Sequence, residues 1–166
     1  DRAPRRVPVP ALRPTLDLCK PTNVALGAGS RVIVAADRGG VGKVLMNRLE
    51  RRGVTVYDLD PQHDAVTLEA QLHACLAEGP VQGVYWLPTL DGEAAIEAMS
   101  SEQWHELNRV RAKNLHLVMH TLVAAGEPPF LVAGTRLGGL HGYGASGANA
   151  PLGGAVTGFT KAYKRE

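Results

Sequence analysis

The sequence Arg31-Val-Ile-Val-Ala-Ala-Asp-Arg-Gly-Gly-Val-Gly42 runs from a block of β-branched residues directly into a cluster of glycines. An uninterrupted apolar block of this length predicts a strand buried on both faces, here residues 31–36. From Gly40 the apolar residues recur at helical spacing, and Gly53 closes the predicted helix. Residues 54–57 then predict a second strand. This order is a βαβ unit, which requires parallel strands and a right-handed crossover.

The same alternation continues along the chain. It predicts further helices and strands in the order helix 64–78, strand 83–87, helix 101–125, strand 129–133 and helix 152–165. The fold class is therefore α/β, with a Rossmann-like, doubly wound parallel sheet. Because the chain ends at Glu166 within or just after a helix, we expect the C-terminal edge of the sheet to be open and truncated, as in a piece of a longer polypeptide.

Three helices carry apolar residues at spacings that predict buried stripes. The stripes are Val41, Val44, Leu45 and Leu49 in the first helix, Val66, Leu68, Leu72 and Leu76 in the second, and Leu152, Val156, Phe159 and Tyr163 in the last. We expect the Phe159 ring to be enclosed. Ser101 is the expected N-cap of the long helix, because its hydroxyl can accept from the first turn.

The length of 166 residues fits one domain preceded by a leader. Residues 1–30 contain five prolines, which predict an extended Pro-rich linker: Pro4, Pro8, Pro10, Pro14 and Pro21. Residues 31–166 form the predicted Rossmann-like domain. Apolar side chains are spaced along the leader, so we expect part of it to pack against the domain or a partner.

Composition excludes several classes of function. The chain is 45% hydrophobic and 20% charged, and its net charge is only +2, with an excess of basic residues in the leader. Aromatic residues make up 5%, which does not suit a nucleic-acid interface. There is no membrane-spanning apolar run and no signal peptide, so we expect neither nucleic acid nor membrane as a partner and place the protein in the cytoplasm. Cys19 and Cys75 lack metal-site spacing, and no metal is expected.

Three glycines are vestigial candidates for holding a dinucleotide. Gly39, Gly40 and Gly42 follow the first strand and open a helix, where free backbone N–H groups attract a pyrophosphate. Asp58, at the end of the second strand, could accept from a ribose hydroxyl or could simply begin a turn; the turn interpretation is favoured.

Two residues at the same loop oppose nucleotide binding. Ala36 stands where the first turn glycine belongs, and Asp37 places a carboxylate beside the phosphate path. Arg38 is the expected compensation for that charge. We therefore expect NADPH binding by this chain to be weak or absent.

The acid–base machinery of reductases built on this sheet is missing from the sequence. No Tyr-x-x-x-Lys occurs, so no phenol is paired with an ammonium on a helix. His116 and His120 lie four residues apart, but no zincin glutamate accompanies them, and they are interpreted as ordinary helix residues. The alternative is a complete NAD(P)-dependent oxidoreductase that uses an unconventional proton donor, Tyr143 or His141, in the glycine-rich loop 134–154.

The closing run Gly153-Gly-Ala-Val-Thr-Gly-Phe-Thr-Lys-Ala162 and the glycine loop after the first strand resemble the short-chain dehydrogenase/reductase superfamily. More closely, Thr135-Arg-Leu-Gly-Gly-Leu-His-Gly-Tyr143 with Ala150–Glu166 is similar to the ketoreductase region of iterative type I polyketide synthases. In that family a structural, pseudo-reductase half often precedes the catalytic half on the same chain. The structural half keeps the fold and loses the active site.

The resemblance carries the family's catalytic tyrosine position onto Asn149, its lysine onto Gly153 and its serine onto Arg136, beside Thr135. Lys113 is similar in context to a lysine that these ketoreductases use on the long helix, but it cannot replace the phenol. The resemblance thus implies a non-catalytic structural subdomain with no cofactor of its own. It implies as partners an NADPH-dependent ketoreductase half on the same polypeptide, which reduces β-ketoacyl thioesters, and an acyl carrier protein.

Overall fold

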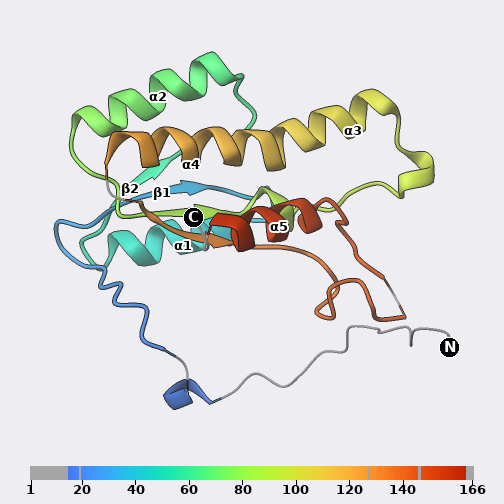
Figure 1. The fold of residues 1–166 in the computed structure, drawn as a ribbon, viewed down its shortest axis with the longest axis horizontal. Helices are drawn as coiled ribbons and strands as arrows, with labels where there is room; N and C mark the ends of the chain where they lie inside the picture. The colour runs from blue at the N-terminus through green and yellow to red at the C-terminus, as the bar shows by residue number, and fades with distance from the viewer. Residues whose placement is uncertain (1–14, 19, 127, 146, 164–166) are drawn as a thin grey trace, which may run out of the picture.

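A computed structural model describes residues 15–18, 20–126, 128–145 and 147–163 (Figure 1). Its centre is a four-stranded sheet in the order β2-β1-β3-β4, in which every pairing is parallel. The strands are β1 Arg31–Ala35, β2 Thr55–Asp58, β3 Gly83–Trp86 and β4 Phe130–Ala133. The sheet confirms the predicted Rossmann-like α/β fold.

In the described residues, five α-helices connect the strands or follow them. They are α1 Val41–Glu50, α2 Ala65–Ala77, α3 Ser101–Asn108, α4 Asn114–Ala125 and α5 Gly153–Tyr163. The predicted single helix 101–125 is interrupted, because Arg109–Lys113 form a π-helical segment between α3 and α4. Its N-cap is Ser100 and not Ser101: the Ser100 hydroxyl accepts from the Gln103 amide, and the Gln103 side chain accepts in return from the Ser100 amide.

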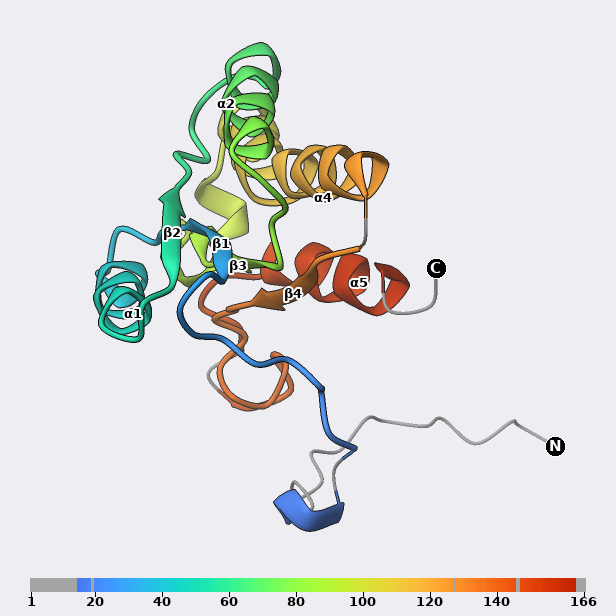
Figure 2. The same cartoon turned by 90° about the vertical axis from the view of Figure 1, so that its left-hand side faces the viewer.

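The helices lie on both faces of the sheet, as Figure 2 shows, with α1 on one side and α2 and α4 on the other. Alternation along β1 sends Val32 and Val34 toward the core beneath α1, whereas Ile33 and Ala35 face the larger core formed with α2, α4 and α5. The connection from β1 to β2 runs in one direction across the sheet, whereas those from β2 to β3 and from β3 to β4 run in the opposite direction. Because each crossover is right-handed, α1 lies on one face of the sheet and the helices of the later connections lie on the other.

The predicted stripe of α1 is only half correct. Leu49 is buried and Leu45 is partly buried, but Val41 and Val44 are exposed. The predicted stripe of α2 also includes a residue that is not buried, since Val66 is 76% exposed. Among the described residues α1 has no neighbouring helix on its face of the sheet, so apolar side chains on its flank have nothing to pack against. The spacing correctly identified the side of each helix that faces the core, but it predicted burial for too many residues at the border of that side.

The stripe of α5 is buried at its beginning and open at its end. Leu152 and Val156 are buried, whereas Phe159 and Tyr163 are half-buried. The Phe159 ring packs against the His116 ring in a T-shaped arrangement and stacks on Tyr163. The expectation that the Phe159 ring is enclosed is therefore wrong, because α5 lies at the margin of the sheet, beside the edge strand β4.

The described part of the leader comprises residues 15–18, which include a short 3₁₀ helix at Leu16–Leu18, and residues 20–30, which are mostly exposed. Leu26 is half-buried and packs against the core on the α1 side. Residues 1–14, on which much of the leader prediction rests, lie outside the described residues.

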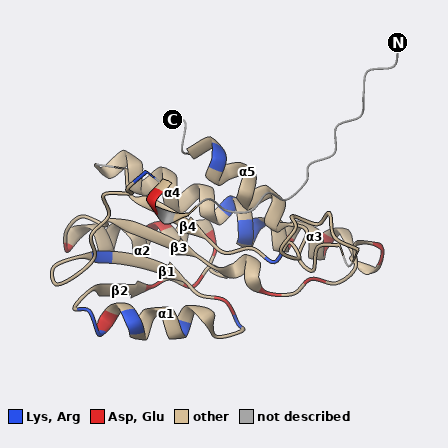
Figure 3. Cartoon of the chain, turned by 90° about the horizontal axis from the view of Figure 1, so that it is seen from below, with Lys and Arg blue, Asp and Glu red and all other residues tan. Residues whose placement is uncertain are grey.

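No helix in the described ranges is long and apolar enough to cross a membrane. In Figure 3, basic and acidic segments alternate along α1.

Candidate functional site

The place to look for a ligand is the crevice between the carboxyl ends of β1 and β3. The chain leaves β1 toward β2 on one side, and β3 lies on the other side, so the strand order reverses at β1. Open α/β sheets bind ligands at such a switch point, where the loops that follow the two strands diverge. Here these loops are residues 36–40, which lead into α1, and residues 87–93, which follow β3.

The Asp37 carboxylate occupies the N-terminus of α1. One of its oxygens accepts from the Gly42 amide at 2.6 Å, and the other accepts from the Val41 amide at 3.2 Å. Asp37 is 9% exposed. Free amides and the helix dipole make this position attractive to a phosphate, and here an anion of the chain itself already satisfies them. The charge of Asp37 is thus balanced by backbone N–H groups.

The crevice is also bridged from the opposite loop. The Arg38 amide donates to the Asp91 carboxylate at 2.8 Å, which joins the loop after β1 to the loop after β3. The Arg38 guanidinium is largely exposed, and its Nε lies 4.0 Å from the other oxygen of Asp91. The expectation that Arg38 compensates Asp37 is therefore wrong, because its carboxylate partner is Asp91.

The three glycines of the loop serve the turn and the packing of α1. Gly40, with φ 92°, is the N-cap residue in a left-handed conformation that favours glycine. A Cβ on Gly42 would lie 2.7 Å from the Cβ of Ala36, and one on Gly39 would lie 2.9 Å from the Asp37 carboxylate. Gly42 therefore allows α1 to approach β1 closely, and Gly39 allows the Asp37 side chain to reach the helix.

Asp58 ends β2 as predicted, and it lines a separate cavity of about 280 Å³ against α2. The turn that follows is closed by Asp60, whose carboxylate accepts from the Gln62 amide at 2.9 Å. This Asx-type bond is the local device that a turn after the strand requires. Asp60, and not Asp58, provides this bond, and the turn lies at residues 61–62.

Asp37→Ala is expected to lower the free energy of unfolding by about 1–2 kcal/mol, because it removes a helix-capping carboxylate from the Val41 and Gly42 amides. Equilibrium unfolding in urea measures the change. Asp58→Ala removes an exposed carboxylate of the same type, and we expect it to cost less than about 0.5 kcal/mol. Equal losses in the two variants would contradict the capping role of Asp37.

A buried ion pair, which the sequence did not reveal, lies beside the crevice. Arg111 in the π-helical segment pairs with Glu93 in the loop after β3, and their side chains are 3% and 0% exposed. The Arg111 guanidinium also donates to the carbonyls of Asp91 and Gly92, at 3.1 and 3.3 Å. The Leu152 amide, just before α5, donates to the second Glu93 oxygen at 3.3 Å. The pair thereby ties three segments together.

Burial acts on both members of this pair. It raises the pKa of Glu93 and lowers the pKa of Arg111, because each charged form loses its hydration. The Leu152 amide and the Arg111 charge act in the opposite direction and lower the pKa of Glu93. In the same way, the Glu93 charge is the largest influence that raises the pKa of Arg111 against the effect of burial. Two opposite charges that neutralise one another are thus buried beside the crevice.

The π-helical segment has an anchor in the sheet. Trp86 is fully buried, and its indole nitrogen donates to the Arg111 carbonyl at 2.8 Å. Next along the segment, Lys113 is exposed and is not among the residues that line the cleft described below. Asn114 is buried and donates to the carbonyls of Pro61 and His63, at 2.9 and 3.2 Å. These contacts fix where α4 begins.

A cleft of about 690 Å³ lies beyond β4, and both Arg136 and Asn149 line it. The Ala150 amide donates to the Arg136 carbonyl at 3.1 Å, which holds the two segments together. A Cβ on Gly153 would lie 3.2 Å from the Cβ of Thr135. The fold thus brings together Thr135, Arg136, Asn149 and Gly153, the positions onto which the resemblance carries the serine, tyrosine and lysine. Glu93 and Glu97, which both carry carboxylates, also line this cleft.

The remaining predicted candidates lie elsewhere. His141 and Tyr143 are exposed in the glycine-rich loop, and neither is among the residues lining this cleft. The rings of His116 and His120 are 5.8 Å apart on α4. Within the described ranges no group of three or more His, Cys, Asp and Glu side chains is placed to hold a metal ion.

No protein-family model and no curated protein sequence matches the chain. Solved structures do match. A short-chain dehydrogenase/reductase from Brucella melitensis, of the glucose/ribitol dehydrogenase type, aligns over 84% of this chain and 70% of its own, with a TM-score of 0.65 and 15% identity. Thermoplasma acidophilum aldohexose dehydrogenase aligns over 80% of this chain and 60% of its own, with a TM-score of 0.60 and 14% identity.

A third structure, gluconate 5-dehydrogenase from Burkholderia cenocepacia in complex with NADP and tartrate, aligns over 82% of this chain and 65% of its own, with a TM-score of 0.55 and 16% identity. The chain therefore spans 60–70% of the length of these three proteins. The class that the fold defines is the Rossmann-like fold of short-chain dehydrogenases and reductases. At this identity the similarity is one of fold.

Proposed function

We propose that this chain is a non-catalytic, reductase-like structural unit. It supports an NADPH-dependent ketoreductase on the same polypeptide, in a cytoplasmic multienzyme of the type I polyketide synthase kind. The solved structures support the reductase fold, and the bound NADP in one of them supports the cofactor of the catalytic half. The polyketide context rests on the similarity of residues 135–143 and 150–166 to that family.

The observation that carries the proposal is the Asp37 carboxylate on the Val41 and Gly42 amides. A dinucleotide phosphate would need the same N–H groups, and it would meet a fixed negative charge there. The Arg38–Asp91 bond closes the other side of the crevice. Both contacts stabilise the fold while they remove the binding chemistry, which is what a structural unit requires.

The cleft beyond β4 supports the same conclusion. Asn149 and Gly153 provide neither a phenol nor an ammonium, so nothing at these positions can donate a proton to a carbonyl as a tyrosine paired with a lysine does. Reduction of a β-ketoacyl thioester carried by an acyl carrier protein would then take place in the other half of the polypeptide. No contact in the described residues favours His141 or Tyr143 as an alternative donor.

The proposal is tested by titrating the chain with NADPH in a calorimeter. We expect no saturable heat, with a Kd weaker than about 1 mM, which corresponds to about −4 kcal/mol. The same protein is then assayed with NADPH and a model β-ketoacyl thioester, and no turnover is expected. Micromolar binding of NADPH, or turnover that is lost in Lys113→Ala or Thr135→Ala, would show that the chain is itself a reductase.

A further inference from the structure

We infer that the outer face of α1 docks the acidic surface of a partner protein, in which carboxylates surround an apolar side chain. Five residues define this face: Val41, Lys43, Val44, Arg48 and Arg51. None of them lines the cleft beyond β4 or the cavity against α2, so docking on α1 does not depend on the proposed function.

One side of α1 faces the sheet and the other side faces away from it, as Figure 2 shows. Leu49 is buried on the inner side, whereas Val41 and Val44 are each 54% exposed. Successive spacings of three, four and three residues place four side chains along one stripe that faces away from the core: Val41, Val44, Arg48 and Arg51. The stripe is thus apolar in its first half and basic in its second half.

The charges along α1 are unbalanced. Residues 38–52 contain five Lys or Arg residues and one acidic residue. Within the described ranges, Lys43, Arg48 and Arg51 form no ion pair with a carboxylate. Arg48 precedes Arg51 by three residues and Arg52 by four, and like charges at these spacings on a helix repel one another. Carboxylates from a partner would offset this repulsion.

The stability of α1 by itself does not require this arrangement. Cations in the last turn of a helix complement its dipole, which accounts for Arg48 and Arg51. Lys43 lies in the first turn, where the dipole disfavours a cation, and that turn contains no acidic residue. Val41 and Val44 are more than half exposed, so the core does not require them to be apolar. Apolar side chains beside a polar rim are typical of a protein interface.

The size of the basic face favours a protein as its partner. A helix of ten residues is about 15 Å long. Asp58 ends β2, which packs against α1, and residues 53–108 contain ten acidic residues and no Lys or Arg. A DNA duplex or an anionic membrane presents a negative surface that extends far beyond one helix, where it would meet these carboxylates. An acidic patch on a protein can match the length of α1 alone.

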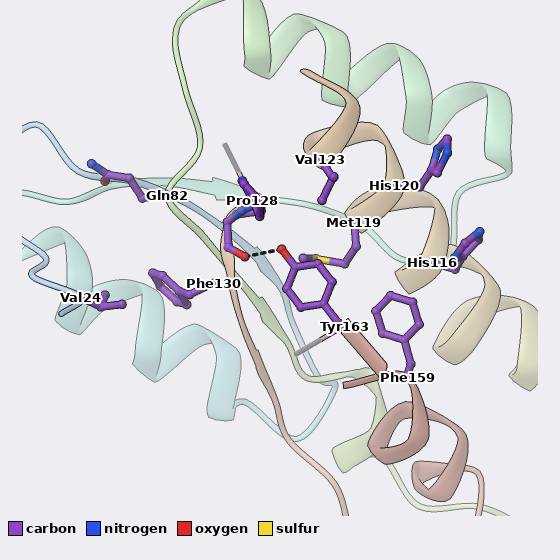
Figure 4. A pocket seen from close by; sticks show the side chains of 11 residues that line it. Val24, Gln82, His116, Met119, His120, Val123, Pro128, Phe130, Phe159 and Tyr163 are labelled. Carbon is purple, nitrogen blue, oxygen red and sulfur yellow. Dashed lines mark hydrogen bonds between the residues drawn. The ribbon is translucent and has the colours of Figure 1, made fainter. Parts of the chain in front are cut away.

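A cavity of about 540 Å³ beside β4 has a different chemistry, as Figure 4 shows. The described residues that line it include no Lys, Arg, Asp or Glu, and Met119, Phe159 and Tyr163 provide apolar walls. The Tyr163 hydroxyl donates to the Pro129 carbonyl at 2.6 Å, so its polar end is already satisfied. An acidic surface would find no cation there. Lys161 is exposed on the same helix as Phe159 and Tyr163, and it provides a cation away from α1 for comparison.

Fluorescence anisotropy with the full chain and a labelled peptide tests the inference. The probe is a helical peptide of about 20 residues built from Glu, Leu and Ala, with its Glu and Leu side chains on one face. We expect saturable binding with a Kd below about 100 μM at low ionic strength. Because charges on both surfaces carry the attraction, we expect the Kd to rise roughly tenfold when about 0.3 M salt is added.

Two double variants with the same change in net charge locate the binding face. Arg48→Gln/Arg51→Gln removes two cations from α1 and is expected to raise the Kd roughly tenfold. Lys113→Gln/Lys161→Gln removes two exposed cations outside α1 and should change the Kd by less than about twofold. Val44→Thr keeps the shape and the charges but makes the stripe less apolar, and a rise of about threefold is expected. Far-ultraviolet circular dichroism verifies that each variant is folded.

Four results would overturn the inference. The first is the absence of saturable binding to the unaltered chain. The second is equal weakening by the two double variants, since the peptide would then respond to net charge alone. The third is tighter binding of a DNA duplex or of phosphatidylglycerol vesicles than of the peptide. The fourth is self-association in sedimentation that Arg48→Gln/Arg51→Gln abolishes, because the acidic region of a second copy would then occupy α1.

Discussion

Arg111→Met is expected to lower the free energy of unfolding by about 3–5 kcal/mol, because it leaves the Glu93 carboxylate buried without its cation. The Glu93 side chain has no exposure to water, and the remaining hydrogen bond from Leu152 comes from a neutral amide. The guanidinium contacts with the carbonyls of Asp91 and Gly92 are lost as well. Equilibrium unfolding in urea measures the change.

The double variant Arg111→Met/Glu93→Leu distinguishes two causes of the instability: the loss of the attraction between the two charges, and the burial of an unpaired carboxylate. Replacing both members with apolar side chains removes the cost of burying an unpaired carboxylate, so we expect it to recover more than half of the loss. Arg38→Ala is the exposed control: the Arg38 side chain is 79% exposed, and we expect a change below about 0.5 kcal/mol. A double variant as unstable as Arg111→Met would contradict this account of the pair.

Trp86→Ala is expected to cost about 3–5 kcal/mol, since it removes a fully buried indole between the sheet and α4. It also leaves the Arg111 carbonyl without the indole N–H that holds the π-helical segment. Thermal and urea unfolding of the full chain measure the effect, and we expect the change in near-ultraviolet circular dichroism to accompany it.

The other tryptophan of the chain provides the control. Trp104 lies on α3 and is 36% exposed, so Trp104→Ala should cost less than about 1 kcal/mol. Trp86→Phe keeps most of the buried ring but not the donor, and an intermediate loss of about 1–3 kcal/mol is expected. If Trp86→Ala and Trp104→Ala had the same effect, the anchoring of the π-helical segment by Trp86 would not be important.

Ion pairing and helix capping stabilise the loops at the switch point of the sheet. The Asp37 carboxylate accepts from the Gly42 amide, the Asp91 carboxylate accepts from the Arg38 amide, and Glu93 pairs with Arg111. The contacts of Asp91 with Arg38 and of Glu93 with Arg111 join segments that are distant in the sequence. Side chains of the chain itself thus stabilise the fold at this switch point.

The order of elements, the parallel sheet and the glycine turn before α1 could be predicted from the sequence. These follow from local information: apolar periodicity, the conformational freedom of Gly40, and the connection lengths of βαβ units. It also identified, through the resemblance, the positions of Arg136, Asn149 and Gly153, which the fold does bring together beyond β4. The absence of a phenol and an ammonium at those positions could be read directly.

Three features could not be predicted from the sequence and are seen only in the folded chain: the amides that donate to Asp37, the pairing of Glu93 with Arg111, and the partial exposure of the Phe159 ring. Periodicity reports which side of an element is apolar, but whether a neighbour covers that side depends on the elements beside it in space. Similarly, Glu93 and Arg111 lie in different segments with no repeat or motif linking them, so their pairing arises only when the loop after β3 and the π-helical segment are packed together. Contacts between segments are set by packing geometry, and no local pattern encodes them.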